Sequence, residues 1–582
     1  MEKRIENLLL TVILLTALGL SLFGVQMGVP SRWYTDEVYA LSLKILGEKS
    51  VTPILTHSFH PGAYPIALAM FQIPYLLILK IFGYPLESAA SAASLSWTQM
   101  ALEHPGFASG IIIWSRLFSV LLGVSSCYIL YKLGRRMYHP RVGLYSALVL
   151  ATSMDFSGTN HFAIPTSLVS FLTLFSFYFV VEFYYSGFNA RFINLAALTA
   201  GLCFSTKLNG LIAILPLGIV LWFVDRRRLI LFIRTSLCYF ILGVILGNPI
   251  VLIHPIETLK RYGYLFNYYL IHVDPATMGQ IEHYNFLTRG IGLINYLIQM
   301  TYGIGIPYAL LALAGIMIYF SDRKNGPFQR WLLGLFLLSY WLIISLTQYG
   351  VNNAPAKASV LLIPFIALLA GAGLEQLLGS KQWGQWKWFK AVLAASAFCY
   401  SFWYCLSADW VLIKKDTRYQ VTQWINENVP EESTVEFLFE INRAASEELF
   451  KNYQILHAGV NARESKGISP FKNMMEKSVY YFNHRETGPE GKYLVLTFDS
   501  FSDIPVIENA SPDTLTGKGP VIQGLLKNKY PYRLVKKFIP SNYKIESRRF
   551  PGVLVPLSFW KNPIPNMGYI SPIVYIYERT RS

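Results

Sequence analysis

Long runs of apolar residues, separated by short polar turns, fill the first 406 residues of the chain. A helix needs about 20 predominantly apolar residues to cross the hydrocarbon core of a membrane. The pattern predicts about eleven such helices, at residues 8–25, 111–133, 143–154, 164–185, 193–204, 208–224, 229–253, 292–320, 331–346, 359–378 and 389–406. The first run has no obvious small-residue cleavage site, so we expect it to be retained as a helix. The runs at 143–154 and 193–204 are short, so longer helices with polar ends and partly re-entrant segments both stay open.

Basic residues predict how these helices are oriented. With a cytoplasmic N-terminus and alternating spans, every cytoplasmic loop is basic, as the positive-inside rule requires. These loops hold Arg135, Arg136, Arg141, Arg191, Arg226, Arg227, Arg228, Arg323, Lys324, Arg330, Lys381, Lys387 and Lys390. The net charge of +16 is therefore spread over loops, which argues against one nucleic-acid-binding stripe. We predict a multi-pass plasma-membrane protein whose C-terminal part is extracytoplasmic.

One further apolar run, residues 65–83, carries Gln72, Pro74 and Lys80. Counting it as a span would move every later loop to the opposite side and place the arginines at 226–228 outside. We therefore predict a helix that lies at the outer membrane interface. It belongs to the first of two long outer loops, residues 26–110 and 254–289.

The pattern changes from residue 407 onward. Alternating and amphipathic segments predict helices at 416–428 and 519–528 and strands at 434–441, 493–499, 532–539 and 573–578. The fold class is thus a polytopic α-helical membrane protein, with a transmembrane domain at 1–406 and a small soluble α/β domain at 407–582. All five cysteines lie in apolar runs before residue 406, so no disulfide framework is expected.

The first residues that suggest chemistry are the adjacent acids Asp36 and Glu37, roughly ten residues past the first helix. Adjacent carboxylates just outside a membrane can deprotonate a hydroxyl or bind a metal. The same residues also fit an exposed helix N-terminus, with Thr35 as the N-cap.

Further landmarks follow the acidic pair in a fixed order. They are His57-Ser-Phe-His60-Pro, Trp-Ser-Arg116-Leu-Phe-Ser, Gly201-Leu-Cys-Phe-Ser-Thr-Lys207-Leu-Asn-Gly210, and the segment 358–371 with Pro364. Their order and the topology of residues 5–406 resemble the GT-C superfamily of glycosyltransferases that use polyprenyl-phosphate sugars. Among its branches, the chain is most similar to protein O-mannosyltransferases and to lipid A aminoarabinose transferases.

The resemblance implies roles for the acidic pair. Asp36 would be the general base that takes a proton from the acceptor hydroxyl, and Glu37 would position the acceptor or the sugar. A polyprenyl phosphate is already a good leaving group, so a single inverting displacement needs only a base and cations for the phosphate.

The resemblance also implies binding residues. Donor phosphate would be held by Lys207, Arg116, His60 and Lys357, and sugar or acceptor by Trp33, Tyr34 and Tyr64. Three of these cations have a plainer interpretation: Lys207 can extend toward lipid headgroups, His60 can be an ordinary interface histidine, and Arg116 can lie near the outer interface. An arginine inside a span, such as Arg116, is by default a functional candidate.

The chain departs from the resemblance at one place. Ile164 and Thr166 occupy positions where relatives often carry an arginine and an aspartate, and Asp155 lies earlier. A second catalytic carboxylate is therefore in doubt.

Metal ligands are less evident. The outer loop 254–289 has no tight ligand spacing among its acids and histidines, which are His254, His272, Asp274, Glu282 and His283. We expect a solvated loop, no defined metal site and no certain cofactor, although dependence on a divalent metal stays open.

The sequence thus favours an inverting hexosyl- or pentosyltransferase. It would move a sugar from a polyprenyl-phosphate donor to a hydroxyl of a protein, lipid or glycan on the outer face, with no nucleic-acid partner. One alternative is a lipid-linked-sugar transporter or flippase, which predicts inverted repeats that the sequence lacks. The other is a catalytically inactive scaffold that binds polyprenyl lipid. An oligosaccharyltransferase is disfavoured because Trp-Trp-Asp-Tyr-Gly does not occur.

Overall fold

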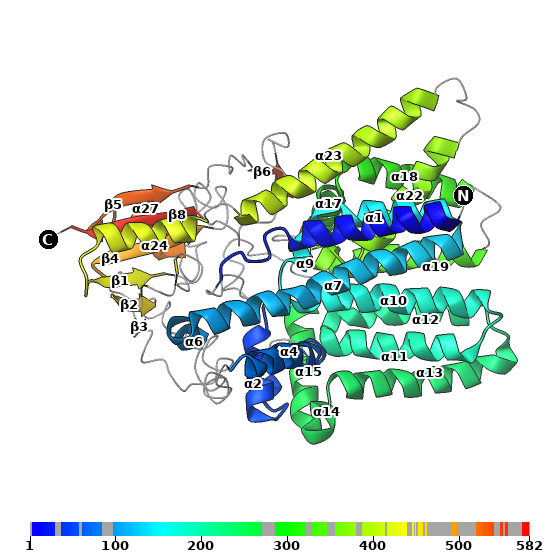
Figure 1. Ribbon diagram of the computed structural model, residues 1–582, viewed down its shortest axis with the longest axis horizontal. Coiled ribbons are helices and arrows are strands. Elements are labelled where there is room, and N and C mark those ends of the chain that lie inside the picture. The colour runs from blue at the N-terminus through cyan, green and yellow to red at the C-terminus, as the bar shows by residue number, and fades with distance from the viewer. Residues whose placement is uncertain are drawn as a thin grey trace.

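The computed structural model describes residues 3–29, 37–57, 61–83, 97–270, 286–321, 327–345, 356–379, 387–413 and 416–438. It also describes residues 445–446, 449, 452–457, 460–461, 491–498, 519–539, 547–550, 553–556 and 573–580. Four predicted site residues, Trp33, Tyr34, Asp36 and His60, lie outside these ranges. Figure 1 shows a bundle of long helices with an α/β domain beyond one of its ends, and the N-terminus lies at the opposite end.

The bundle follows the apolar runs of the sequence. It consists of α1 (Lys3–Leu22), α7 (Pro105–Met137), α8 (Pro140–Ala151), α10 (Pro165–Tyr185), α11 (Ala190–Thr206), η1 (Leu208–Ala213), α12 (Ile214–Leu221), α13 (Arg226–Gly247), α18 (Ile306–Ser321), α19 (Pro327–Ser345), α22 (Ile363–Gly379) and α23 (Lys387–Ile413). Four of these helices begin at proline, whose fixed φ suits the first helical position. Six described helices are long and apolar enough to cross a membrane, which confirms the prediction of a polytopic membrane protein.

The apolar run predicted as a span at 292–320 is bent in the structure. The structure has two helices there, α17 (Phe286–Ile304) and α18, which meet at an angle of 110°. Gly305 lies between them with a φ of 97°, a conformation that glycine adopts without steric cost. Pro307 then fits the first turn of α18. As a result α17 packs against the short helix α9 (Met154–Asn160) and against α21 (Ala356–Ser359).

Further helices gather near the end of the bundle that is closer to the α/β domain (Figure 1). They are α2 (Tyr39–Glu48), α3 (Pro53–His57), α4 (Ala63–Ile81), α6 (Trp97–Glu103), α14 (Ile250–Ile253) and α15 (Pro255–Leu270). In Figure 1, α4 is seen nearly along its axis, whereas α7, α10, α11 and α13 run across the picture. By its length and composition α4 could also span a membrane. Its interfacial placement stays a prediction.

Close helix packing depends on small residues. Gly201 of α11 faces Gly243 of α13, and a Cβ at residue 243 would lie 2.2 Å from the carbonyl oxygen of Leu198. Small residues allow membrane helices to approach closely, because apolar surface gives little driving force within lipid.

Ion pairs tie helices together at the end of the bundle that holds the N-terminus. Arg135 of α7 lies 3.1 Å from Glu6 of α1, and Arg136 lies 3.3 Å from Glu182 of α10. These contacts place Arg135 and Arg136, which we predict to be cytoplasmic, beside partners at one end of the bundle.

The C-terminal domain is built on a six-stranded sheet with the order β3-β2-β1-β4-β8-β5. The strands are β1 (Thr434–Phe437), β2 (Gln454–His457), β3 (Val460–Asn461), β4 (Tyr493–Phe498), β5 (Tyr532–Phe538) and β8 (Ile573–Arg579). A separate hairpin pairs β6 (Ser547–Phe550) with β7 (Val553–Pro556). β1 is parallel to β2 and β4, whereas β8 is antiparallel to β4 and β5.

Two helices cover the sheet. Residues of α24 (Thr417–Asn428) share an apolar cluster with one face, and residues of α27 (Gly519–Leu526) share one with the other face. Alternate residues of β4 divide between the two clusters, because side chains alternate along a strand. The prediction of a C-terminal α/β domain is confirmed, including all four predicted strands and both helices.

We expect Gly243→Ala to destabilise the protein, because its new methyl group would collide with backbone that cannot move freely. Overpacking of this kind costs about 1–3 kcal/mol. Gly218→Ala in α12 is the matched control, since no atom lies within 4 Å of a Cβ built there. Thermal melting in detergent should show a lower midpoint only for Gly243→Ala. Equal midpoints would mean that α11 and α13 are not closely packed.

Candidate active site

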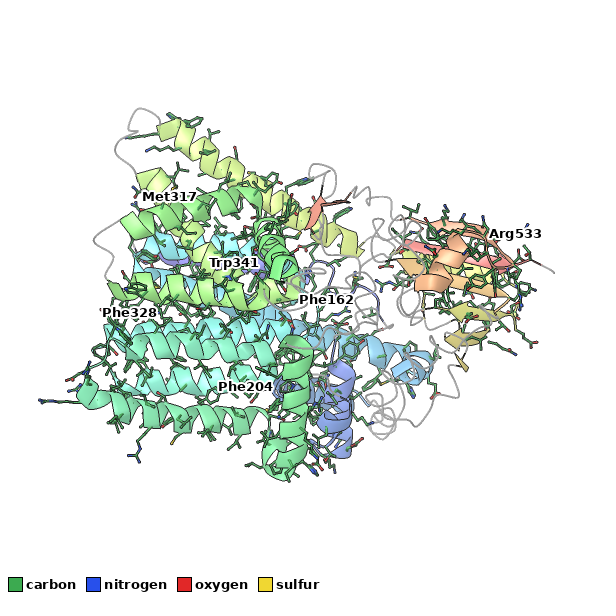
Figure 2. All side chains as sticks on the ribbon, turned by 180° about the vertical axis from the view of Figure 1, so that it is seen from behind. Phe162, Phe204, Met317, Phe328, Trp341 and Arg533 are labelled. Atoms are coloured by element: carbon green, nitrogen blue, oxygen red, sulfur yellow. The ribbon has the colours of Figure 1, made fainter. Side chains whose placement is uncertain are left out.

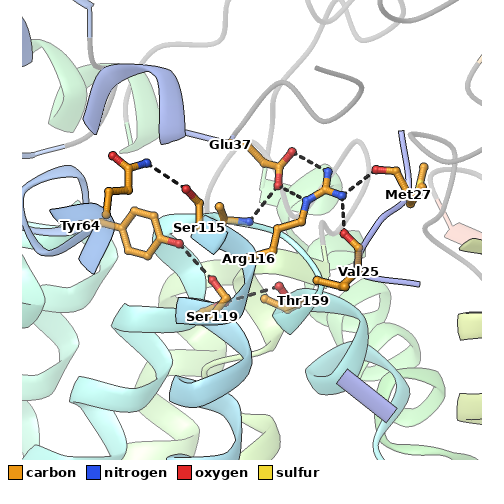
Figure 3. A network of polar contacts seen from close by, with 11 residues as sticks. Val25, Met27, Glu37, Tyr64, Ser115, Arg116, Ser119 and Thr159 are labelled. Carbon is orange, nitrogen blue, oxygen red and sulfur yellow. Dashed lines mark hydrogen bonds and ion pairs between the residues drawn. The ribbon is translucent and has the colours of Figure 1, made fainter. Parts of the chain in front are cut away.

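A buried ion pair joins the first outer loop to the bundle. The Arg116 guanidinium donates from Nε to Glu37 Oε1 at 2.8 Å and from Nη2 to Glu37 Oε2 at 2.9 Å (Figure 3). Arg116 and Glu37 are 1% and 0% exposed, so both charges lie away from water. A bidentate pair of this kind is the arrangement in which buried charges best offset their lost hydration.

Arg116 also binds the chain just after α1. Its Nη1 donates to the carbonyl oxygens of Val25 at 2.7 Å and Met27 at 2.6 Å. Both carbonyls lie beyond Leu22, the last residue of α1, and Arg116 binds them together. A single guanidinium therefore binds residues that precede and residues that follow segment 30–36.

Glu37 has a second partner, from a third part of the chain. Its Oε1 accepts a hydrogen bond of 2.9 Å from the backbone N–H of Ala163, and Val38 N donates to Ala163 O at 3.2 Å. Glu37 directly follows Asp36, the predicted base, in the sequence. The described contacts thus fix the neighbour of the predicted base, although Asp36 itself lies outside the described residues.

Figure 2 places Phe162 at the end of the bundle that is nearer the C-terminal domain. The central guanidinium carbon of Arg116 lies 5.4 Å from the centre of that ring. The ion pair therefore lies at this end of the bundle, opposite the ion pairs of Glu6 and Glu182.

Lys207 lies where α11 ends. Its Nζ is 3.4 Å from Thr166 Oγ1, and its side chain is partly exposed. Thr166 thus occupies the place beside this cation where the resemblance leads us to expect a carboxylate. Ile164, the other departure, is buried in an apolar cluster with Met27 and Phe162.

A polar chain extends from the Lys207 turn to α21. Asn209 Nδ2 donates to Tyr340 Oη at 3.2 Å, and Tyr340 donates to Ala358 O at 3.0 Å. Lys357, the residue before Ala358, lies in α21 with a side chain outside the described part of the structure. The fold therefore brings the backbone of Lys357 toward the turn that carries Lys207.

Tyr64 is fully buried, and its hydroxyl lies 3.0 Å from Ser119 Oγ of α7 (Figure 3). In this arrangement its ring meets no surface, so stacking on a sugar would require a rearrangement. Its predicted role in sugar binding stays untested.

Sequence reasoning missed Arg261. We expected a solvated loop at 254–289, but residues 255–270 form α15, an amphipathic helix. Arg261 points inward and donates from Nη1 to Ile54 O at 2.6 Å, while burial lowers its pKa to about 10. The signal in the sequence was the amphipathic spacing of that helix.

Among the residues that the structure describes, no cluster of acids, histidines or cysteines could hold a metal ion.

Asp155 of α9 is a second buried carboxylate. Gln299 of α17 donates to its Oδ2 at 2.8 Å, and Asp155 is 6% exposed. Burial raises the pKa of Asp155 to about 7, although the hydrogen bond from Gln299 opposes that shift. Asp155 is thus buried against α17, and in this position its carboxylate is not open to a substrate as a second catalytic group.

The geometry can now be compared with known proteins. Residues 112–253 match the model of the dolichyl-phosphate-mannose-protein mannosyltransferase family. The apo oligosaccharyltransferase of Archaeoglobus fulgidus has a TM-score of 0.53 and 12% identity, over 99% of this chain and 89% of that one. ArnT from Cupriavidus metallidurans, bound to undecaprenyl phosphate, has a TM-score of 0.49 and 13% identity, over 88% and 96%. No curated protein sequence matches the chain.

These matches confirm the resemblance at the level of the fold. The chain has a GT-C membrane fold with a C-terminal α/β region. The family match spans Arg116 and Lys207, but not the residues of the first outer loop.

We expect Glu37→Gln to destabilise the fold strongly, because it leaves the Arg116 charge buried without a counter-charge. Breaking a buried pair costs about 3–5 kcal/mol. Glu182→Gln is the control, since its partner Arg136 is 41% exposed and such pairs contribute about 0–1 kcal/mol. The fraction of monodisperse protein after heating measures both variants. Equal monodisperse fractions for Glu37→Gln and Glu182→Gln would show that the ion pair is not the main anchor of the loop.

Proposed function

We propose that this chain, whose fold is that of the GT-C membrane glycosyltransferases, is an inverting glycosyltransferase. It transfers a sugar from a polyprenyl phosphate to an acceptor hydroxyl on the outer face of the membrane. The Archaeoglobus fulgidus protein with a similar fold is an oligosaccharyltransferase, which supports the general class of sugar transfer. The sugar is a hexose or pentose, and the acceptor is a hydroxyl of a protein, a lipid or a glycan.

The observation that carries this proposal is the ion pair between Glu37 and Arg116. Both Glu37 oxygens are already hydrogen-bonded, so Glu37 is a structural anchor and Asp36 is the acid next to it that can act as base. Arg116 uses all three of its nitrogens on Glu37, Val25 and Met27. We therefore propose that Arg116 and Glu37 position Asp36, instead of binding phosphate and sugar directly.

The proposed chemistry is a single displacement at the anomeric carbon. The acceptor oxygen forms a bond to that carbon as the bond to the phosphate oxygen breaks, and the electron pair leaves with the polyprenyl phosphate. The hydroxyl proton passes to the Asp36 carboxylate. Attack opposite the leaving group inverts the anomeric configuration. A base contributes about 10²–10⁴-fold to such a step.

Cations are needed where negative charge grows on the phosphate. Lys207 is the best placed, because its Nζ lies at a partly exposed turn beside a neutral threonine. A carboxylate in place of Thr166 would add a negative charge beside it. Arg261 lies on α15, which packs against η1, the turn that follows Lys207, and we propose it as a second cation. His60 and Lys357 stay candidates on the strength of the sequence.

We further propose that the end of the bundle with Arg135 and Arg136 is cytoplasmic and that the protein lies in the plasma membrane. The ion pair of Glu37 and the C-terminal domain then face outward, where a lipid-linked donor is presented. Donor lipid would enter laterally from the bilayer.

We expect Asp36→Asn to lower transfer by about 10²–10⁴-fold while folding and donor binding persist, because only the proton acceptor is removed. Purified protein in lipid would be offered a panel of polyprenyl-phosphate sugars with simple hydroxyl acceptors. Asp225→Asn is the control, because this residue caps α13 at the other end of the bundle and asparagine also caps helices.

Near-normal turnover by Asp36→Asn would show that Asp36 is not the base. Donor binding without turnover in the wild type, after a wide acceptor panel, would favour the inactive scaffold. Movement of intact donor across the membrane would favour the transporter.

We expect Thr166→Asp to weaken donor binding about tenfold, because a carboxylate near Lys207 Nζ would compete with the phosphate. Thr166→Ser keeps a hydroxyl and should bind normally. Equilibrium binding of a sugar-free polyprenyl phosphate in nanodiscs measures this effect without turnover. Unchanged affinity of Thr166→Asp would place the phosphate away from Lys207.

A further inference from the structure

The chain that leaves α1 is held by side chains from three distant regions. We call residues 20–29 the exit segment. Its backbone carbonyls accept hydrogen bonds as follows: Leu20 and Phe23 from His161, Val25 and Met27 from Arg116, and Val29 from Tyr419. Leu20 O also accepts a hydrogen bond from Phe23 N, whereas the side-chain donors come from three residues, His161, Arg116 and Tyr419, that are far from this segment in the sequence.

His161 is the first of these partners. It is 1% exposed, and its Nε2 lies 2.8 Å from Phe23 O and 3.1 Å from Leu20 O. Burial lowers the pKa of His161 to about 4, so the ring is neutral at pH 7. Because both acceptors are carbonyls, the proton resides on Nε2. Asp409 of α23 lies 3.6 Å from the same nitrogen.

Tyr419 comes from the C-terminal domain. Its hydroxyl donates to Val29 O at 3.3 Å from the first turn of α24. That turn is fixed by Asp416, which caps the helix and forms a buried ion pair of 2.8 Å with Arg418. The hydroxyl is therefore presented from a well-anchored part of the domain.

Apolar packing supports the same contact independently. Leu412 of α23 lies so close to Gly24 that a Cβ there would be 2.6 Å from the Leu412 Cβ, and Gly24 has a φ of 96°. The rings of Phe23 and Trp410 stack with centroids 5.9 Å apart. The helix that leads to the C-terminal domain is thus docked directly on the exit segment.

We propose that His161 and Tyr419 are positioning residues for the transfer reaction. They hold the exit segment at its two ends, and Arg116 connects its middle to Glu37 and so to Asp36. The C-terminal domain therefore takes part in positioning the base. The expected effect on transfer rests on the proposed function, whereas the holding of the exit segment by His161 and Tyr419 does not.

The test uses the full-length protein in nanodiscs. Tyr419→Phe removes only the hydroxyl, and Tyr453→Phe is its matched control, because Tyr453 bonds two carbonyls inside the C-terminal domain. His161→Phe removes the donor, His161→Gln restores an N–H, and His139→Gln is a control at the far end of the bundle. Amide hydrogen exchange of residues 20–37 and transfer kinetics are measured on each.

We expect Tyr419→Phe to raise exchange of residues 20–37 about fivefold, the size of one lost hydrogen bond, and to lower kcat about as much with an unchanged KM for donor. His161→Phe should do more, and His161→Gln should recover part of the loss. Both controls should match the wild type.

Unchanged exchange in Tyr419→Phe and in His161→Phe would overturn the proposal, as would raised exchange with unchanged kcat. If His161→Phe does not fold, the exchange and kinetics of Tyr419→Phe alone still test the proposal. If the wild type transfers no sugar, the proposed function fails on its own, and the exchange data alone decide whether the C-terminal domain holds the exit segment.

Discussion

The buried ion pair between Glu37 and Arg116 is the constraint on which the rest of this end of the bundle depends. Two charges with almost no exposure persist only if each satisfies the other and their remaining hydrogen-bonding atoms find partners. Here those partners are backbone groups of Val25, Met27 and Ala163. The need to satisfy one arginine therefore draws together α7, the end of α1, the start of the first outer loop and the chain after α9.

Much of the fold follows from the sequence because its causes are local. Apolar runs predicted the bundle helices, and several of these helices begin at proline. The alternation of apolar and polar residues predicted strands of the C-terminal sheet. The bend at Gly305 was missed because both of its arms are apolar, and a hydropathy pattern does not register backbone direction. The inward face of α15 was missed because a polar loop and an amphipathic helix have similar compositions.

The candidate site was harder to predict because its contacts are not local. Arg116 could be singled out as an arginine in an apolar run, but its partner Glu37 is separated from it by 79 residues, and only the packed fold identifies that pair. The two departures at Ile164 and Thr166 looked alike in the sequence. In the fold they differ: Ile164 fills an apolar cluster, whereas Thr166 faces Lys207. The expected charged residues are therefore replaced by an apolar contact at Ile164 and by a neutral neighbour of Lys207 at Thr166.

The pairing of Glu37 with Arg116 also bears on how a neighbouring carboxylate can serve as a base. A guanidinium close to a carboxylate favours its ionised form and makes it a weaker proton acceptor. Because Glu37 neutralises Arg116 in a bidentate pair, the arginine can fix the backbone beside Asp36 without imposing an unbalanced positive charge on it. The positive charge for the phosphate would come instead from Lys207, on a different helix end. In the proposed reaction, anchoring and phosphate binding would thus use separate cations, Arg116 and Lys207.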